Sequence, residues 1–224
     1  MNTLTKLARG FLGQLKPRPA VGDLRTTLTL PAAEQQGGMS LMETFKARRS
    51  GREFSPEALP MQQLSNLLWS AIGINRSESG GHTVPSAMFA NEVDVYVALP
   101  EGLYHYAPDS HELHLIVASD VRPVTGYQDF VDNAPLDLIY VANHGRMKLI
   151  PESRREIYAA TCVGTIAQNV YLYCASAGLS TVLRGWFDSK ALGAAMNLSE
   201  SQHIVLTQTV GMPASYGKPG ELPH

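Results

Sequence analysis

Residues 152–177, ESRREIYAATCVGTIAQNVYLYCASA, are a long stretch of helical periodicity around which the rest of the predicted fold is arranged. Small and apolar residues recur in it every three or four positions, which predicts one continuous helix with a packing stripe. The stripe consists of Ile157, Ala160, Thr161, Gly164, Ala167, Val170, Tyr171, Cys174 and Ala177. Gly178 is the expected end of the helix. The stripe permits close contact with a second helix, although it could also pack against a sheet.

Shorter elements before and after this helix predict a single α+β domain. Apolar runs and alternations predict strands at Val93–Val97, Gly102–Tyr106, Leu113–Ile116, Leu136–Ala142, Leu179–Leu183 and Ile204–Val210. Further helices are expected at about 40–48, 64–72 and 188–196. Ser40 and Glu43 have the spacing of a capping box, and Gly73 is expected to end its helix in a left-handed turn. The polar, glycine-rich stretch 75–84 is expected to be a loop.

The first 38 residues are predicted to be an arm, and residues 39–224 to be the domain. Prolines and the Gln35–Gly38 run favour an extended chain, with a short strand where Leu28 and Leu30 alternate with threonines. Residues 1–15 are amphipathic and predict a helix that is either loose or docked on the domain. Attachment of this helix to a membrane surface is the less favoured alternative.

The composition excludes several classes of function. Hydrophobic residues make up 44% of the chain and the net charge is −2, so the basic surplus expected of a sequence-blind nucleic-acid binder is missing. No apolar run approaches ~20 residues, so no membrane span is expected. Cys162 and Cys174 lie on one predicted helix, too far apart to pair, and suit the core and a cytoplasmic protein. The histidines at 105, 111 and 114 have no matching ligand set, so no metal is expected.

Arg48-Arg49-Ser50-Gly51-Arg52 is the strongest candidate for a binding segment. It lies between two predicted helices, and guanidinium groups bind phosphate through paired hydrogen bonds, to which the Ser50 hydroxyl adds a donor. The Rossmann and Walker glycine patterns are absent from the chain. Taken alone, the segment is better interpreted as a solvated basic loop.

Several segments, in order, resemble the FMN-dependent nitroreductase family, including its branch related to azoline-forming dehydrogenases. They are RRSGREF at 48–54, LSNLLWSAIGI at 64–74, PSA at 85–87, GLYHY at 102–106, Gln168-Asn169 with Gly178-Leu179, RGWFD at 184–188 and GMP at 211–213. The resemblance implies a nitroreductase-like α+β fold, with a central, mostly antiparallel sheet flanked by helices. It also implies a homodimer, with the long central helix at the dimer interface.

The activity that the resemblance implies is that of an FMN-dependent NAD(P)H oxidoreductase. Hydride would pass through flavin N5 to an electron-poor small-molecule acceptor such as a nitroaromatic or a quinone, so no side-chain catalytic dyad is needed. A flavin-binding carrier or sensor with little turnover is the alternative. Neither nucleic acid nor a membrane is an expected partner.

The resemblance also implies which residues contact FMN. They are Arg48, Arg49, Ser50, Arg52, Pro85, Ser86, Ala87, Met88, Asn91, Leu183, Arg184, Gly185 and Lys218. The Arg-Arg-Ser segment would hold the phosphate and pyrimidine edge, residues 85–87 would approach from the other subunit, and the backbone at 184–185 would meet N5. Residues 88–91 and Arg184 depart from the family's pattern, which leaves acceptor and nicotinamide preference open. Residues 145–153 and 75–83 are the two candidate lids.

Overall fold

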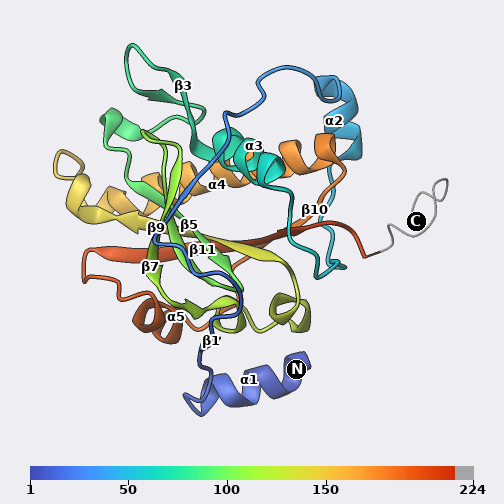
Figure 1. Ribbon diagram of the computed structural model, residues 1–224. Coiled ribbons are helices and arrows are strands. Elements are labelled where there is room, and N and C mark those ends of the chain that lie inside the picture. The colour runs from blue at the N-terminus through green and yellow to red at the C-terminus, as the bar shows by residue number, and fades with distance from the viewer. Residues whose placement is uncertain (215–224) are drawn as a thin grey trace.

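A seven-stranded antiparallel sheet forms the centre of the molecule in the computed structural model, which describes residues 1–214 (Figure 1). Its strand order is β10-β11-β9-β5-β6-β7-β2. The strands are β10 (Ser180–Arg184), β11 (Gln202–Gly211), β9 (Leu136–Asn143), β5 (Val93–Leu99), β6 (Gly102–Ala107), β7 (Glu112–Val117) and β2 (Thr27–Thr29). The predicted strands are therefore present, and β9 is paired on both sides, as its nearly unbroken apolar run predicts.

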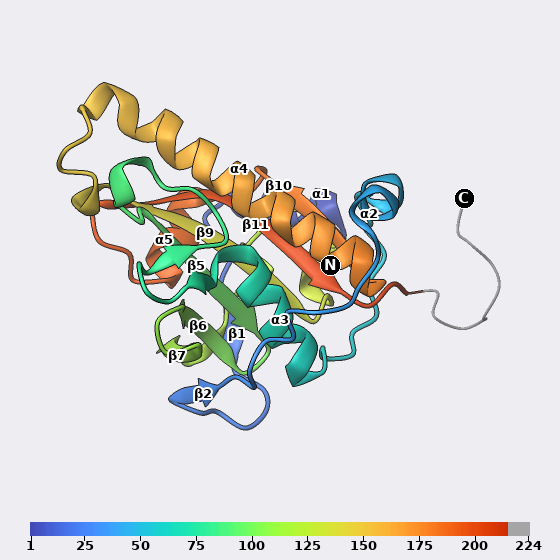
Figure 2. The same cartoon turned by 90° about the horizontal axis from the view of Figure 1, so that it is seen from above.

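Helices cover both faces of this sheet. They are α1 (Thr3–Phe11), α2 (Leu41–Ala47), α3 (Met61–Ile72), α4 (Glu152–Ala177) and α5 (Ser189–Ala195) among the described residues. Figure 2 shows α4 crossing the sheet diagonally, with α3 beside it, while α1 and α5 lie on the other side in Figure 1. This is the α+β architecture that the sequence predicts, and the helix boundaries agree with expectation to within a few residues.

The two cores follow from the alternation of side chains along the central strands. Val95 and Val97 of β5 pack under α3 and α4, together with Leu67, Val163 and Val170. Their neighbours Tyr96 and Ala98 point to the opposite face, where they pack with Val124 and with Leu192 of α5. Because both faces of the sheet are buried, the strands are apolar on both sides.

The long helix α4 uses only part of its predicted stripe to pack on the sheet. Ala167, Val170 and Cys174 are buried, but Ile157, Ala160, Thr161 and Gly164 are exposed. The helix instead buries Ala159, Cys162, Val163 and Ile166 in its first half. Gly178 ends the helix with φ +71°, in the left-handed conformation that glycine adopts without steric cost.

Two local predictions were wrong. Gly73 ends α3 with φ −64° and ψ 163°, which is an extended and not a left-handed conformation. A glycine is still required there, because a Cβ atom would lie 2.5 Å from the Trp69 ring. The stretch 75–84 is not a plain loop, since Ile74–Arg76 (β3) pairs with Gly81–His82 (β4).

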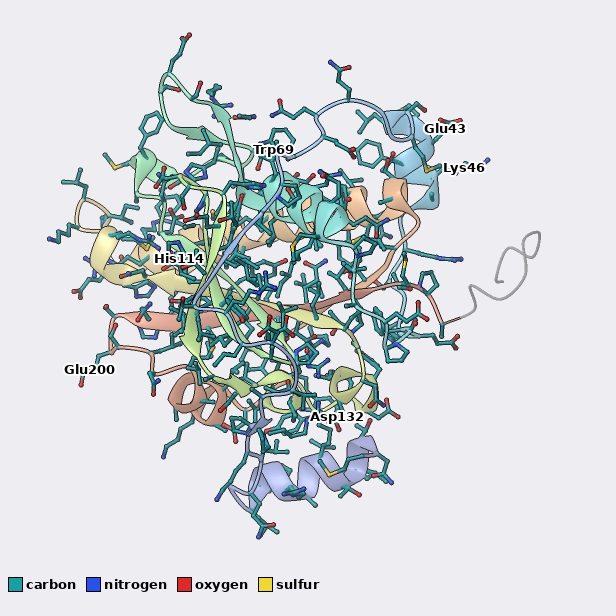
Figure 3. All side chains as sticks on the ribbon, viewed as in Figure 1. Glu43, Lys46, Trp69, His114, Asp132 and Glu200 are labelled. Atoms are coloured by element: carbon teal, nitrogen blue, oxygen red, sulfur yellow. The ribbon has the colours of Figure 1, made fainter. Side chains whose placement is uncertain are left out.

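The N-terminal arm is integrated into the domain at three places. Strand β2 forms the sheet edge beside β7, and Arg18–Pro19 (β1) pairs with Ser119–Asp120 (β8). Helix α1 docks below the sheet through an ion pair between Lys6 Nζ and Asp132 Oδ1 at 2.7 Å. Figure 3 shows Asp132 just above α1, on the side of the helix that faces the domain. Within residues 1–214, no helix is long and apolar enough to cross a membrane.

Candidate functional site

The Arg48–Arg52 segment begins where α2 ends. Ser40 and Glu43 form the predicted capping box, which fixes the start of the helix. Arg48 is the C-terminal cap with ψ 123°, so the chain leaves the helix in an extended conformation. Gly51 N–H then donates to Thr181 O at 3.0 Å, which places the segment beside β10. A Cβ atom on Gly51 would overlap the Ser180 side chain, so this close approach requires glycine.

Tyr171 of α4 holds this segment and β10 together. Its hydroxyl lies 2.9 Å from Ser50 Oγ and accepts a hydrogen bond from Leu183 N–H at 2.9 Å. The Arg48 guanidinium lies 5.3 Å from the centre of the Tyr171 ring, within cation–π range. Three predicted FMN-contacting residues from two segments therefore meet at one side chain. Sequence reasoning placed Tyr171 only in the packing stripe; its polar tip in that stripe was the available signal.

Arg184 does not present its charge at the surface beside Gly185. Its guanidinium is buried and pairs with Asp137 at 2.6 Å, and it donates to Thr125 O at 2.8 Å. Burial lowers the pKa of Arg184, and the Asp137 carboxylate opposes that shift. The expectation that Arg184 alters ligand preference through its position near the ring therefore needs correction, because the side chain points into the core. What this turn exposes is the backbone of Gly185.

The loop 85–91 is not brought to Tyr171 within one chain. Pro85 O accepts a hydrogen bond from Cys162 Sγ at 3.5 Å, and Cys162 precedes Tyr171 by nine residues on α4. At about 1.5 Å per residue, the two attachment points are about 14 Å apart along the helix. Within one chain, residues 85–91 and Arg48–Arg52 therefore meet α4 about two and a half turns apart.

Internal hydrogen bonds hold this loop in a strained conformation. Ser86 Oγ donates to Glu92 Oε2 at 2.6 Å and accepts from Asn91 N–H at 2.8 Å. Met88, Phe89 and Asn91 have φ values of +54°, +55° and +43°, which residues other than glycine rarely adopt. The loop consequently directs Met88 and Phe89 outward, with exposed fractions of 65% and 88%.

A cleft of about 410 Å³ separates residues 88–90 from residues 145–150. The first candidate lid, 145–153, therefore lies against the predicted cofactor loop. The second candidate, 75–83, forms the β3–β4 hairpin and does not line this cleft.

One predicted contact stands apart from the Tyr171 cluster. Arg52 lines a different cavity of about 520 Å³, together with Phe54, Phe130 and the residues Met1 and Asn2 that precede α1. Lys218 lies outside the described residues. Cys162 is a core residue, as predicted. Its burial raises the pKa of the thiol to about 12, so the thiol stays protonated.

Comparison with known proteins identifies the family. The Nitroreductase family pattern matches residues 45–212, more than half of the chain. The protein of Methanocaldococcus jannaschii named "Putative nitroreductase MJ1384" is 32% identical over 183 residues, which are 77% of this chain and 90% of the relative. The structure of a "putative nitroreductase" from Ralstonia eutropha JMP134 is 52% identical, with a TM-score of 0.87, and covers 90% of this chain and 96% of that one.

More distant structures share the fold alone. A chain of the E. coli microcin synthetase McbBCD complex has a TM-score of 0.67 at 17% identity, covering 93% of this chain and 92% of that one. A Desulfovibrio desulfuricans protein described in complex with FMN has a TM-score of 0.58 at 17% identity, covering 84% and 94%. From the family pattern and the close relatives, this chain belongs to the nitroreductase family.

Proposed function

We propose that this protein is an FMN-dependent NAD(P)H oxidoreductase whose cofactor site is built around Tyr171. The observation that carries the proposal is the convergence of Arg48, Ser50 and Leu183 on that side chain. Family membership and the FMN complex of a structural relative support the choice of cofactor.

The groups at this position suit a flavin mononucleotide. Arg48 lies at the Tyr171 ring and forms no ion pair with another described residue, so its guanidinium is available to an anionic phosphate. Arg52 forms none either, but it lines a separate cavity. The Ser50 hydroxyl can donate to a ring oxygen, and the exposed backbone of Gly185 offers an N–H without a side chain in the way. When bound, FMN would supply the hydride-transfer chemistry that the side chains of this chain lack.

The protein's own part is to position the cofactor and exclude water. Tyr171 fixes the distance between the Arg48 segment and β10, and the Gly51–Thr181 hydrogen bond holds that segment against the strand. The apolar Met88 and Phe89 would shield a partner's site from solvent. NADH or NADPH would be the hydride donor and a nitroaromatic or quinone the acceptor. The two would occupy the same position beside the flavin in turn.

A homodimer completes the proposed site. The outer face of α4 exposes Ile157, Tyr158 and the small residues around Gly164. Leu41, Met42 and Phe45 of α2 are exposed as well. Apolar surface of this extent is typical of an interface between subunits, and it adjoins the Tyr171 cluster on α4. A second copy on this face would supply the 85–91 loop, which one chain does not bring to its own Arg48.

Absorbance spectroscopy tests the proposal directly. The purified protein is reconstituted with FMN, freed of excess flavin, and titrated anaerobically with NADH and with NADPH. We expect bound flavin that is bleached by at least one of them, and turnover when a quinone or nitroaromatic is added. Bound flavin that stays oxidised with both donors would contradict the oxidoreductase proposal and favour a carrier or sensor.

A further inference from the structure

Helix α1 is attached to the domain by its polar side. The Lys6 side chain is fully buried; its ammonium lies 2.7 Å from Asp132 Oδ1 and donates to Gln128 O at 3.3 Å. One turn later, Gly10 packs so closely on the Tyr127 ring that a Cβ atom would lie 2.5 Å from it. The face that touches the protein is therefore defined by a lysine and a glycine.

The opposite side of the same helix is apolar and exposed. Leu4, Phe11 and Leu12 have exposed fractions of 77%, 90% and 68%. At 3.6 residues per turn, these three and Ala8 occupy a sector of about 100°, centred roughly opposite Lys6 and Gly10. Scattered exposed apolar residues need no explanation, but a contiguous stripe of them on one helix indicates an interaction surface.

The proposed homodimer does not account for this stripe. Figure 1 shows α1 at the lower end of the molecule, whereas α2 and α4 lie in its upper half. Met1 and Asn2, which precede α1, line a cavity with Arg52, but the apolar stripe of α1 lies on a different element from the outer face of α4. The stripe is thus a second surface that requires its own occupant.

The charges around α1 indicate what that occupant is. Residues 1–22 contain Lys6, Arg9, Lys16 and Arg18 and no acidic residue. Lys6 and Arg18 are paired with Asp132 and Asp120, but Arg9 and Lys16 are exposed and form no ion pair with a described residue. The exposed acidic residues Glu53 and Asp129 lie near Met1 and Asn2, at the start of α1, whereas Arg9 and Lys16 lie toward its other end. An exposed apolar stripe flanked by these two cations complements a surface that is both apolar and anionic, which is the boundary of an anionic lipid bilayer.

We propose that α1 docks the protein flat on an anionic membrane surface, with Leu4, Phe11 and Leu12 inserted at the level of the headgroups and Arg9 and Lys16 facing lipid phosphates. At nine residues the helix is far too short to span the bilayer, so the contact is interfacial. The proposal departs from the expectation that a membrane is not a partner. The proposal does not rest on the flavin chemistry.

Vesicle flotation of the full-length protein tests this inference. The wild type is mixed with vesicles of phosphatidylcholine alone and with vesicles that also contain phosphatidylglycerol. We expect binding to the anionic vesicles and much weaker binding to the neutral ones. Leu4→Ser/Phe11→Ser/Leu12→Ser should lower the partition coefficient by about 100-fold or more, because most of the inserted apolar area is removed. Arg9→Gln/Lys16→Gln should lower it by about 30-fold on anionic vesicles only, at about 1 kcal/mol for each cation.

Leu149→Ser is the matched control, since Leu149 has the same exposed fraction as Leu4, 77%, but lies in the 145–150 loop. It should bind anionic vesicles like the wild type, and circular dichroism should show that all variants are folded. The proposal is overturned if the wild type binds neither vesicle, or if the triple variant binds as well as Leu149→Ser. It is also overturned if light scattering shows that the triple variant dissociates a larger assembly into dimers, because the stripe would then bind a second copy of the chain.

Discussion

Helices α4 and α1 both leave apolar residues exposed. Helix α4 is attached to the protein by an apolar face, whereas α1 is attached by a face that contains a buried lysine. Val163, Ile166 and Val170 of α4 pack against the sheet, and the exposed side of that helix carries Ile157, Tyr158 and small residues among polar ones. Helix α1 buries Lys6 and Gly10 instead, and its apolar side faces solvent. Periodicity reports that a helix has an apolar stripe; only the packing shows whether that stripe serves the chain's own core.

The difference has an energetic side. Each large apolar side chain that α4 buries contributes roughly 1.5–3 kcal/mol, so its attachment is spread over many residues. Attachment of α1 depends on the Lys6–Asp132 pair. The attraction within a buried ion pair is largely offset by the free-energy cost of removing both charges from water. The position of α4 should therefore resist single substitutions, whereas that of α1 should not.

The largest effect is expected from a charge on the outer face of α4. Gly164→Glu should fold normally, because nothing lies within 4 Å of a Cβ atom there and glutamate is the better helix former. In a dimer it would bury a charge between the subunits, so we expect a monomer in light scattering and loss of FMN retention by more than about 100-fold. Gly193→Glu on α5 has equally open surroundings within the chain and should change neither property. A flavin-loaded dimer of Gly164→Glu would refute the interface.

The next effect concerns the attachment of α1. Lys6→Met removes the nearer of two cations beside the buried Asp132 carboxylate, leaving the N-terminal ammonium at 3.3 Å, and should lower the free energy of unfolding by about 3 kcal/mol, measured by urea denaturation. Protease sensitivity of residues 1–15 should rise at the same time. Arg9→Met on the exposed side should cost less than about 0.5 kcal/mol. Equal effects of the two substitutions would show that Lys6 does not hold the helix.

A smaller effect is expected from the hydroxyl of Tyr171 on α4. Tyr171→Phe keeps the ring but leaves Leu183 N–H and Ser50 Oγ without their partner, so FMN affinity should fall about 10- to 100-fold. Tyr173→Phe on the same helix removes a hydroxyl that donates to Gln63 O, away from the Arg48 segment, and should change affinity less than 3-fold. Fluorescence quenching of free FMN measures both. Similar losses would mean that the hydroxyl of Tyr171 does not organise the site.

The smallest effect is a pH dependence of the free energy of unfolding, expected from the Lys6 ion pair that attaches α1 and not from the apolar face that attaches α4. Burial lowers the pKa of Lys6 below its ordinary value of 10.5, although Asp132 opposes the shift. Between that lowered pKa and 10.5 the unfolded chain binds more protons than the folded one, so the free energy of unfolding should rise with pH across this window. Urea denaturation at several alkaline pH values should show this slope in the wild type and less of it in Lys6→Met. An identical slope in both would assign it to other groups.

Much of the fold was predictable because it depends on local signals. The Ser40–Glu43 capping box, Gly178 and the continuous apolar run of β9 each specify an element without distant partners. The end of α3 was not predictable in this way. Gly73 is required by the nearby Trp69 ring and not by a positive φ, and a sequence pattern does not distinguish those two reasons.

The candidate site was predictable in its segments but not in its geometry. Resemblance to a family located Arg48–Arg52 and Leu183–Gly185, and the structure joins them. The joining residue, Tyr171, was hidden in a stripe assigned to packing. Arg184 was expected beside the flavin ring, and its buried partner Asp137 lies 47 positions away in the sequence. Contacts over such separations depend on strand register, which local periodicity does not report.

Native mass spectrometry of the FMN-reconstituted protein tests the central claim most directly, because it counts chains and cofactors in one measurement. A cofactor site built from Arg48, Tyr171 and β10 of one chain and loop 85–91 of another predicts a dimer that carries two FMN molecules. It also predicts that flavin and dimer are lost together in Gly164→Glu. A wild-type monomer that retains FMN would contradict this account, as would a stable dimer that binds none.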